Sequence, residues 1–134
     1  MATIADIEGV GPAYAAKLAD AGVKTTDGLL ETAGAKAGRV KLAEATGISE
    51  SLILEWVNRA DLYRINGVGS ELSDLLEAAG VDSVPELAAR VPANLHAKLT
   101  EVNDAKNLVR QVPSLSQVEK FVAEAKTLDK VVTH

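Results

Sequence analysis

The chain has 134 residues, of which 47% are hydrophobic and 3% aromatic, and its formal net charge is −5 at pH 7. This hydrophobic content predicts a buried core, and the scarcity of aromatic residues favours packed helices over a β-sheet. Cysteine is absent, which excludes a disulfide framework, a thiolate nucleophile and a zinc-thiolate site. Many nucleic-acid-binding domains are basic overall, so any anion-binding surface of this acidic chain must be local.

The sequence shows neither a membrane span nor a secretion signal. No apolar run reaches the roughly 18 residues that a transmembrane helix needs. The first six residues, Met-Ala-Thr-Ile-Ala-Asp, lack the basic start and apolar stretch of a signal peptide. We therefore expect a cytoplasmic protein that makes no contact with a membrane.

The strongest pattern is an internal repeat. Residues 7–11 (Ile-Glu-Gly-Val-Gly) match residues 65–69 (Ile-Asn-Gly-Val-Gly), and without a gap residues 21–23 match residues 79–81. With small shifts, residues 41–60 match residues 98–125, and the second copy holds extra residues near 104–111. The repeat predicts two similar units, residues 1–60 and 61–134, packed about a pseudo-twofold axis into one compact domain.

The boundaries of the predicted helices follow from Gly, Pro, Ser and Thr positions. In each copy a helix follows the Gly-Val-Gly turn, opening at Pro12 or Ser70, and ends at a glycine, Gly22 or Gly80. The next helix begins at Thr25 in the first copy.

Two later helices in the second copy carry start signals of their own. The tetrapeptides 83–86 (Ser-Val-Pro-Glu) and 114–117 (Ser-Leu-Ser-Gln) have the form of a capping box. The fold class is therefore all-α, with at least about two-thirds helix. Trp56 and Phe121 occupy matching apolar positions and are expected in the core, with Tyr14 and Tyr63 in the core or at its boundary.

The repeated element resembles the helix-hairpin-helix motif. In the first copy it runs from Ile7 to Pro12 and continues with the apolar residues Tyr14, Leu18 and Ala21. Two glycines allow a tight turn, and the free N–H groups of the following helix can hold a phosphate. The resemblance implies tandem helix-hairpin-helix repeats that contact the DNA backbone without reading bases.

The whole chain also resembles an uncharacterised, mainly bacterial family of paired helix-hairpin-helix domains. The resemblance rests on residues 45–48 (Ala-Thr-Gly-Ile), 56–62 (Trp-Val-Asn-Arg-Ala-Asp-Leu), 74–81 (Asp-Leu-Leu-Glu-Ala-Ala-Gly-Val), 101–103 (Glu-Val-Asn) and 109–115 (Val-Arg-Gln-Val-Pro-Ser-Leu). It implies the fold and brings no established activity.

The candidate nucleic-acid site combines the first turn with nearby basic side chains. Its residues are Gly9, Val10, Gly11, Lys17, Lys36, Arg39 and Lys41. The second turn, Gly67-Val68-Gly69, is a secondary candidate, because Glu71 and Asp74 follow it and would repel phosphate.

An alternative function remains open. Both turns can be purely structural connectors, and the acidic balance, including Glu8 before the first turn, then favours a protein–protein adaptor or assembly module. No catalytic residue is apparent, because the chain lacks a nucleophile elbow and a P-loop. His96 and His134 have no companions at ligand spacing, so no metal or other cofactor is expected. The sequence thus predicts a non-enzymatic binding module whose partner is a weakly held DNA backbone or another protein.

Overall fold

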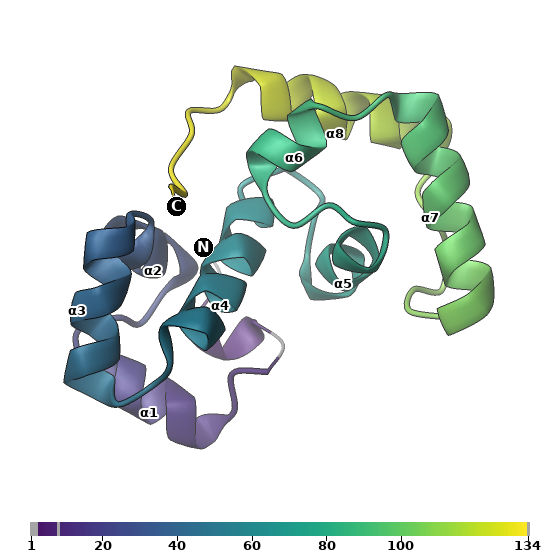
Figure 1. Ribbon diagram of the computed structural model, residues 1–134. Helices are drawn as coiled ribbons and strands as arrows, with labels where there is room; N and C mark the ends of the chain where they lie inside the picture. Colours follow the sequence, from purple (N-terminus) through teal and green to yellow (C-terminus); the bar gives the residue numbers. More distant parts are fainter. Residues whose placement is uncertain (1–2, 8, 134) are drawn as a thin grey trace. The chain divides into compact units, whose positions relative to one another are not determined.

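The computed structural model describes residues 3–7 and 9–133 (Figure 1). It is 66% helical, and the only β-pairing among the described residues is an isolated bridge between Thr3 and Thr25. The expected all-α class is confirmed. Glu8, the acidic residue before the first turn, and His134 lie outside the described residues. Within the described part of the chain, no helix combines the length and apolarity that crossing a membrane requires.

The described part of the chain forms one short 3-10 helix and eight α-helices. In chain order they are η1 (Ile4–Asp6), α1 (Pro12–Asp20), α2 (Thr26–Ala33), α3 (Lys36–Thr46), α4 (Glu50–Leu62), α5 (Ser70–Ala78), α6 (Val84–Ala88), α7 (Pro92–Lys106) and α8 (Leu115–Thr127). They divide between two compact units. Unit 1 is the chain up to Asp61 together with the stretch from Lys130 onward, and unit 2 is Leu62–Asp129.

The C-terminal segment therefore packs in unit 1, although the predicted second unit extended to residue 134. Backbone hydrogen bonding explains this placement, because the Thr133 N–H donates to the Gly34 carbonyl at 2.9 Å. Val132 beside it is buried. The segment ends beside the junction between α2 and α3 in unit 1 (Figure 1).

The predicted ends of α1 and α5 are confirmed. Gly22 and Gly80 follow these helices with φ of +89° and +94°, a left-handed conformation that glycine adopts without strain. The next amide closes the turn in the same way in both copies, since Val23 donates to the Leu18 carbonyl and Val81 to the Leu76 carbonyl, each at 2.8 Å. The turns that end α1 and α5 thus share one backbone geometry.

Helices begin directly after Thr25, Ser83 and Ser114, as predicted, and two of these three residues form a side-chain cap. The Thr25 hydroxyl accepts from the Gly28 amide at 3.0 Å, and Ser114 forms both bonds of a capping box with Gln117. The capping box predicted at Ser83 is wrong, because no side-chain bond caps α6. The carboxylate of Glu86 lies 3.8 Å from Arg90 instead, one helical turn further along.

The two large aromatic residues lie behind the two turns, and their predicted burial is confirmed. Trp56 is 1% exposed and Phe121 is 9% exposed. A Cβ built on Gly9 would lie 3.6 Å from Trp56 Nε1, and one on Gly67 would lie 3.4 Å from Phe121 Cε1. Tyr14 is a boundary residue, since it is exposed on one side and its ring meets Trp56 edge-on, with 5.1 Å between centroids.

Candidate functional site

The two Gly-Val-Gly turns have the same backbone path. Gly9 and Gly67 both have φ of +89°. The valine amide that follows each glycine donates 3.1 Å to the carbonyl of the isoleucine that precedes the turn. In both turns the isoleucine and the valine are buried and the two glycines are exposed. Each turn therefore anchors its apolar residues in its own unit and presents bare backbone to solvent.

Helix α1 starts at the exposed end of the first turn. Gly11 is its N-cap residue and supplies no side-chain cap, and the first intrahelical bond runs from the Ala15 amide to the Gly11 carbonyl at 2.9 Å. The amides of Ala13 and Tyr14 have no acceptor within the helix, and Pro12 has no N–H group. These amides stand at the positive end of the helix dipole, where an anion is stabilised.

Lys17 is the candidate cation that shares a helix with the first turn. It is exposed, and its Nζ atom lies 6.0 Å from the centroid of the Tyr14 ring. Helical side chains lean toward the N-terminus, so the ammonium group reaches back along α1 in the direction of the free amides. Lys17 therefore supplies positive charge on the side where α1 begins.

Arg39 does not belong to a surface that binds phosphate. Its side chain is 4% exposed, and its guanidinium donates to the carbonyls of Ala33 (3.2 Å), Gly34 (2.7 Å) and Thr133 (2.5 Å). It caps the end of α2 and holds the C-terminal segment in place. Both terminal nitrogens of the guanidinium are thus engaged by backbone carbonyls, and the side chain is buried, so Arg39 has a structural role in place of the predicted phosphate contact.

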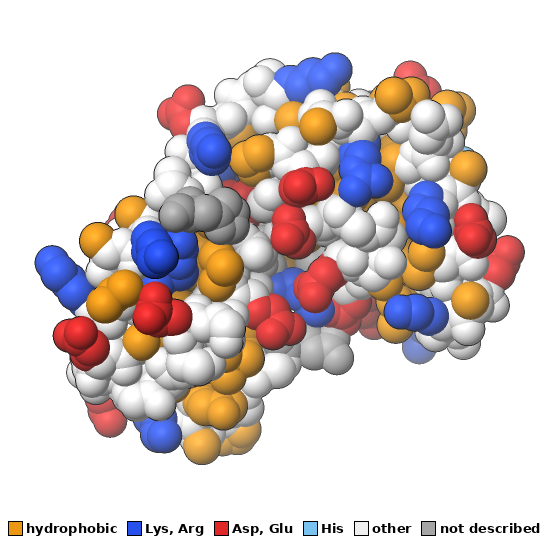
Figure 2. Space-filling model, viewed as in Figure 1, with side chains coloured by type: hydrophobic (Ala, Val, Ile, Leu, Met, Phe, Trp, Pro, Cys, Tyr) orange, Lys and Arg blue, Asp and Glu red, His pale blue; other side chains and the backbone are white. Residues whose placement is uncertain are grey.

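The basic window 33–43 does not extend to the first turn. Lys36 is exposed and, together with Arg39, lines a hollow of about 180 Å³ that also contains the carboxylate-bearing Glu50. Lys41 is exposed on α3, and no described contact joins either lysine to the first turn. On the face that Figure 2 draws, positive and negative side chains of the described residues are interspersed. The cationic character of the first turn thus depends mainly on Lys17 and the α1 dipole.

The second turn faces carboxylates from two helices. Glu71 is exposed on the first turn of α5, as expected from the sequence, and Glu124 on α8 accepts from the Asn66 amide at 3.1 Å. Sequence reasoning missed Glu124, and it also missed Arg110, which shares a cleft with Gly67 and Glu71. The repeat pattern indicated only the residues within and directly after the second turn. Glu124 and Arg110 lie more than 40 positions further along the chain, so no local pattern links them to this turn.

A family model described as Domain of unknown function (DUF4332) matches residues 8–128 of the chain. Comparisons with curated proteins and with solved structures gave no significant match. The family match is consistent with the resemblance to an uncharacterised domain family, and it assigns no activity to any residue described above.

Proposed function

The chain belongs to the family Domain of unknown function (DUF4332), and we propose that this member is a non-enzymatic binding module whose first glycine turn contacts a nucleic-acid backbone. The observation that carries the proposal is the start of α1. There, exposed Gly11 leads into a helix whose first amides lack intrahelical acceptors, and Lys17 lies on the same helix. Helix-hairpin-helix turns, which the sequence resembles, use this arrangement for sequence-independent contact with phosphates.

The proposed interaction is weak and strongly dependent on salt. Binding through phosphate contacts gains its free energy from the release of counterions, and log K changes with log salt by about −0.9 for each phosphate neutralised. The net charge of −5 repels DNA at long range, and salt screens that repulsion over roughly 10 Å at 0.1 M. Affinity should therefore be similar for unrelated sequences and should be measurable only at low salt.

The experiment is a fluorescence anisotropy titration of labelled duplex and single-stranded DNA between about 50 and 200 mM salt. Lys17→Glu should weaken binding by about tenfold, as expected for loss of one charge-assisted contact. The matched control, Lys126→Glu on α8, makes the same charge change in unit 2 and should have a much smaller effect. Equal losses of affinity in the two variants would show that binding depends on the net charge of the protein and not on the first turn.

A protein–protein adaptor is the second candidate, and two observations favour it. Arg39 is occupied by backbone carbonyls, and Tyr14 presents a partly exposed ring directly beside the first turn. Aromatic side chains of this kind commonly anchor protein interfaces. If no DNA binding appears even at about 50 mM salt, the nucleic-acid proposal fails and the adaptor becomes the better account.

A further inference from the structure

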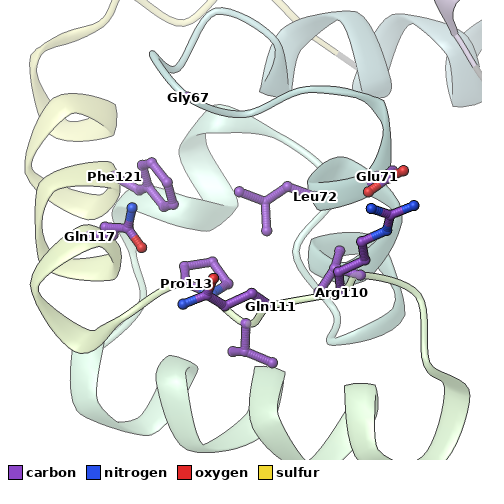
Figure 3. Close-up of a pocket in the computed structure, with 10 residues that line it drawn as sticks. Gly67, Glu71, Leu72, Arg110, Gln111, Pro113, Gln117 and Phe121 are labelled. Atoms are coloured by element: carbon purple, nitrogen blue, oxygen red, sulfur yellow. The ribbon is translucent and has the colours of Figure 1, made fainter.

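Unit 2 contains a cleft, and part of its wall comes from a chain segment that has no counterpart in the first copy of the repeat. The cleft has a volume of about 340 Å³, is open to solvent, and lies between the second glycine turn, the connection from α7 to α8, and the start of α8 (Figure 3). One side of it is built by residues 109–113. This connection includes the extra residues that distinguish the second copy from the first.

A side-chain clamp holds this connection in place. The Asn103 side chain accepts from the Val109 amide at 2.9 Å and donates to the Val109 carbonyl at 3.1 Å. Asn107 supplies the left-handed residue that ends α7, with φ of +51°. These bonds fix the backbone just before Arg110 and Gln111, which line the cleft. The fold of unit 2 therefore holds this wall of the cleft in place.

The middle of the cleft is apolar. Leu72 from α5, Pro113 from the connection and Phe121 from α8 surround it (Figure 3). Pro113 and Phe121 are buried and Leu72 is half-buried. An apolar group that enters the cleft would be removed from water on several sides, which stabilises it in proportion to the area buried.

Two opposite charges lie at one end of the cleft. Figure 3 shows Glu71 and Arg110 together at the end away from Phe121 and Gln117. Both are exposed, and neither makes a hydrogen bond or an ion pair with the described residues. At the other end, the side-chain oxygen Oε1 of Gln117 accepts from the Ser114 amide at 2.9 Å, which leaves the side-chain NH₂ group of Gln117 able to donate.

We propose that this cleft binds a free α-amino acid with a large apolar side chain. The ammonium group pairs with Glu71, the carboxylate pairs with Arg110, and the side chain lies among Leu72, Pro113 and Phe121. A simple anion would be repelled by Glu71 and a simple cation by Arg110, whereas a zwitterion places an opposite charge beside each of them. The cleft shares no residue with the first glycine turn or with Lys17, so the two proposals stand independently.

The test is an NMR titration of the ¹⁵N-labelled full chain with L-leucine and L-phenylalanine. Saturable shifts are expected at the amides of Gly67, Leu72 and Arg110, with a Kd on the order of 1 mM, because exposed charge pairs are weak. Glycine, isopentylamine and 4-methylpentanoate each lack one of the three groups and should bind at least about fivefold more weakly. If either single-charge analogue binds as tightly as leucine, the zwitterion proposal is overturned.

Two charge-removing variants locate the contacts. Glu71→Gln should weaken leucine and isopentylamine binding, and Arg110→Gln should weaken leucine and 4-methylpentanoate binding, each by about tenfold. Glu119→Gln and Lys126→Gln make the same charge changes on α8 outside the cleft lining and should leave binding unchanged. Absence of saturable shifts, or equal effects of cleft and control variants, refutes the proposal.

The DNA experiment distinguishes failure of this proposal from failure of the proposed function. Lys17→Glu should leave the Kd for leucine unchanged. In the Arg110→Gln background, Lys17→Glu should weaken DNA binding by the same factor as in the wild type. Loss of leucine binding in the Lys17 variant would overturn the assignment to the unit 2 cleft.

Discussion

Replacing Arg39 with methionine should destabilise unit 1 by about 3 kcal/mol. Methionine keeps most of the apolar stem of the side chain, so the change removes the guanidinium and leaves the packing of α3 largely intact. The guanidinium donates to the carbonyls of Ala33, Gly34 and Thr133. Without it, these carbonyls lose a charged donor.

The expected loss of stability depends on which hydrogen bonds each of the three carbonyls keeps in the variant. An unsatisfied buried polar group costs about 1–3 kcal/mol, and removing one partner of a buried charged interaction costs about 3–5 kcal/mol. The Gly34 carbonyl keeps one bond, from the Thr133 amide, and Thr133 is exposed, so water can replace its lost donor. The Ala33 carbonyl therefore bears most of the loss, and about 3 kcal/mol is the expected total.

The assay uses urea denaturation followed by tryptophan fluorescence. Trp56 is the only tryptophan in the chain and is buried in unit 1, so its emission reports on the unit that contains Arg39. For an m-value of about 1–3 kcal/mol per molar urea, the midpoint should fall by roughly 1–3 M. Binding of DNA at low salt should not change in the fraction that remains folded.

A second variant tests whether Arg39 acts through the C-terminal segment. Truncation after Asp129 removes the Thr133 partner, so the truncation should cost at least about 1 kcal/mol less in the Arg39→Met background than in the wild type. Additive effects, or a midpoint within about 0.3 M of the wild type for Arg39→Met alone, would refute the reasoning.

Two further substitutions test the first turn and the residue behind it. Trp56→Ala should cost about 3–5 kcal/mol in urea denaturation followed by circular dichroism, because the indole is fully buried; a loss under about 1 kcal/mol would contradict this. Gly9→Ala should cost about 1–2 kcal/mol, because Gly9 has φ of +89°. Its control, Gly11→Ala, should cost less, about 0.5 kcal/mol from the poorer N-cap alone, since φ there is −79° and nothing lies within 4 Å of an added Cβ. Equal losses in the two alanine variants would exclude backbone strain as the cause.

Local sequence determined the elements that depend on near neighbours. The glycine ends of α1 and α5, the Thr25 cap and the Ser114 capping box all involve residues within a few positions of one another, so their pattern is readable directly. The duplication adds a second, independent instance of the turn and of the helix that follows it. The Ser83 capping box did not form, and the Glu86 carboxylate lies 3.8 Å from Arg90, a partner that the four-residue pattern does not include.

Only the tertiary structure decided which charged side chains face solvent. Arg39 lies in a basic window and was expected at the surface, but its partner Thr133 is 94 positions away. Arg110 lies in the extra residues of the second copy, and only folding places it in a cleft with Glu71 and Phe121. The physical reason is the same in both places. A helix pattern is fixed by contacts within one or two turns, whereas the environment of a long charged side chain depends on which distant backbone or carboxylate the fold brings to it.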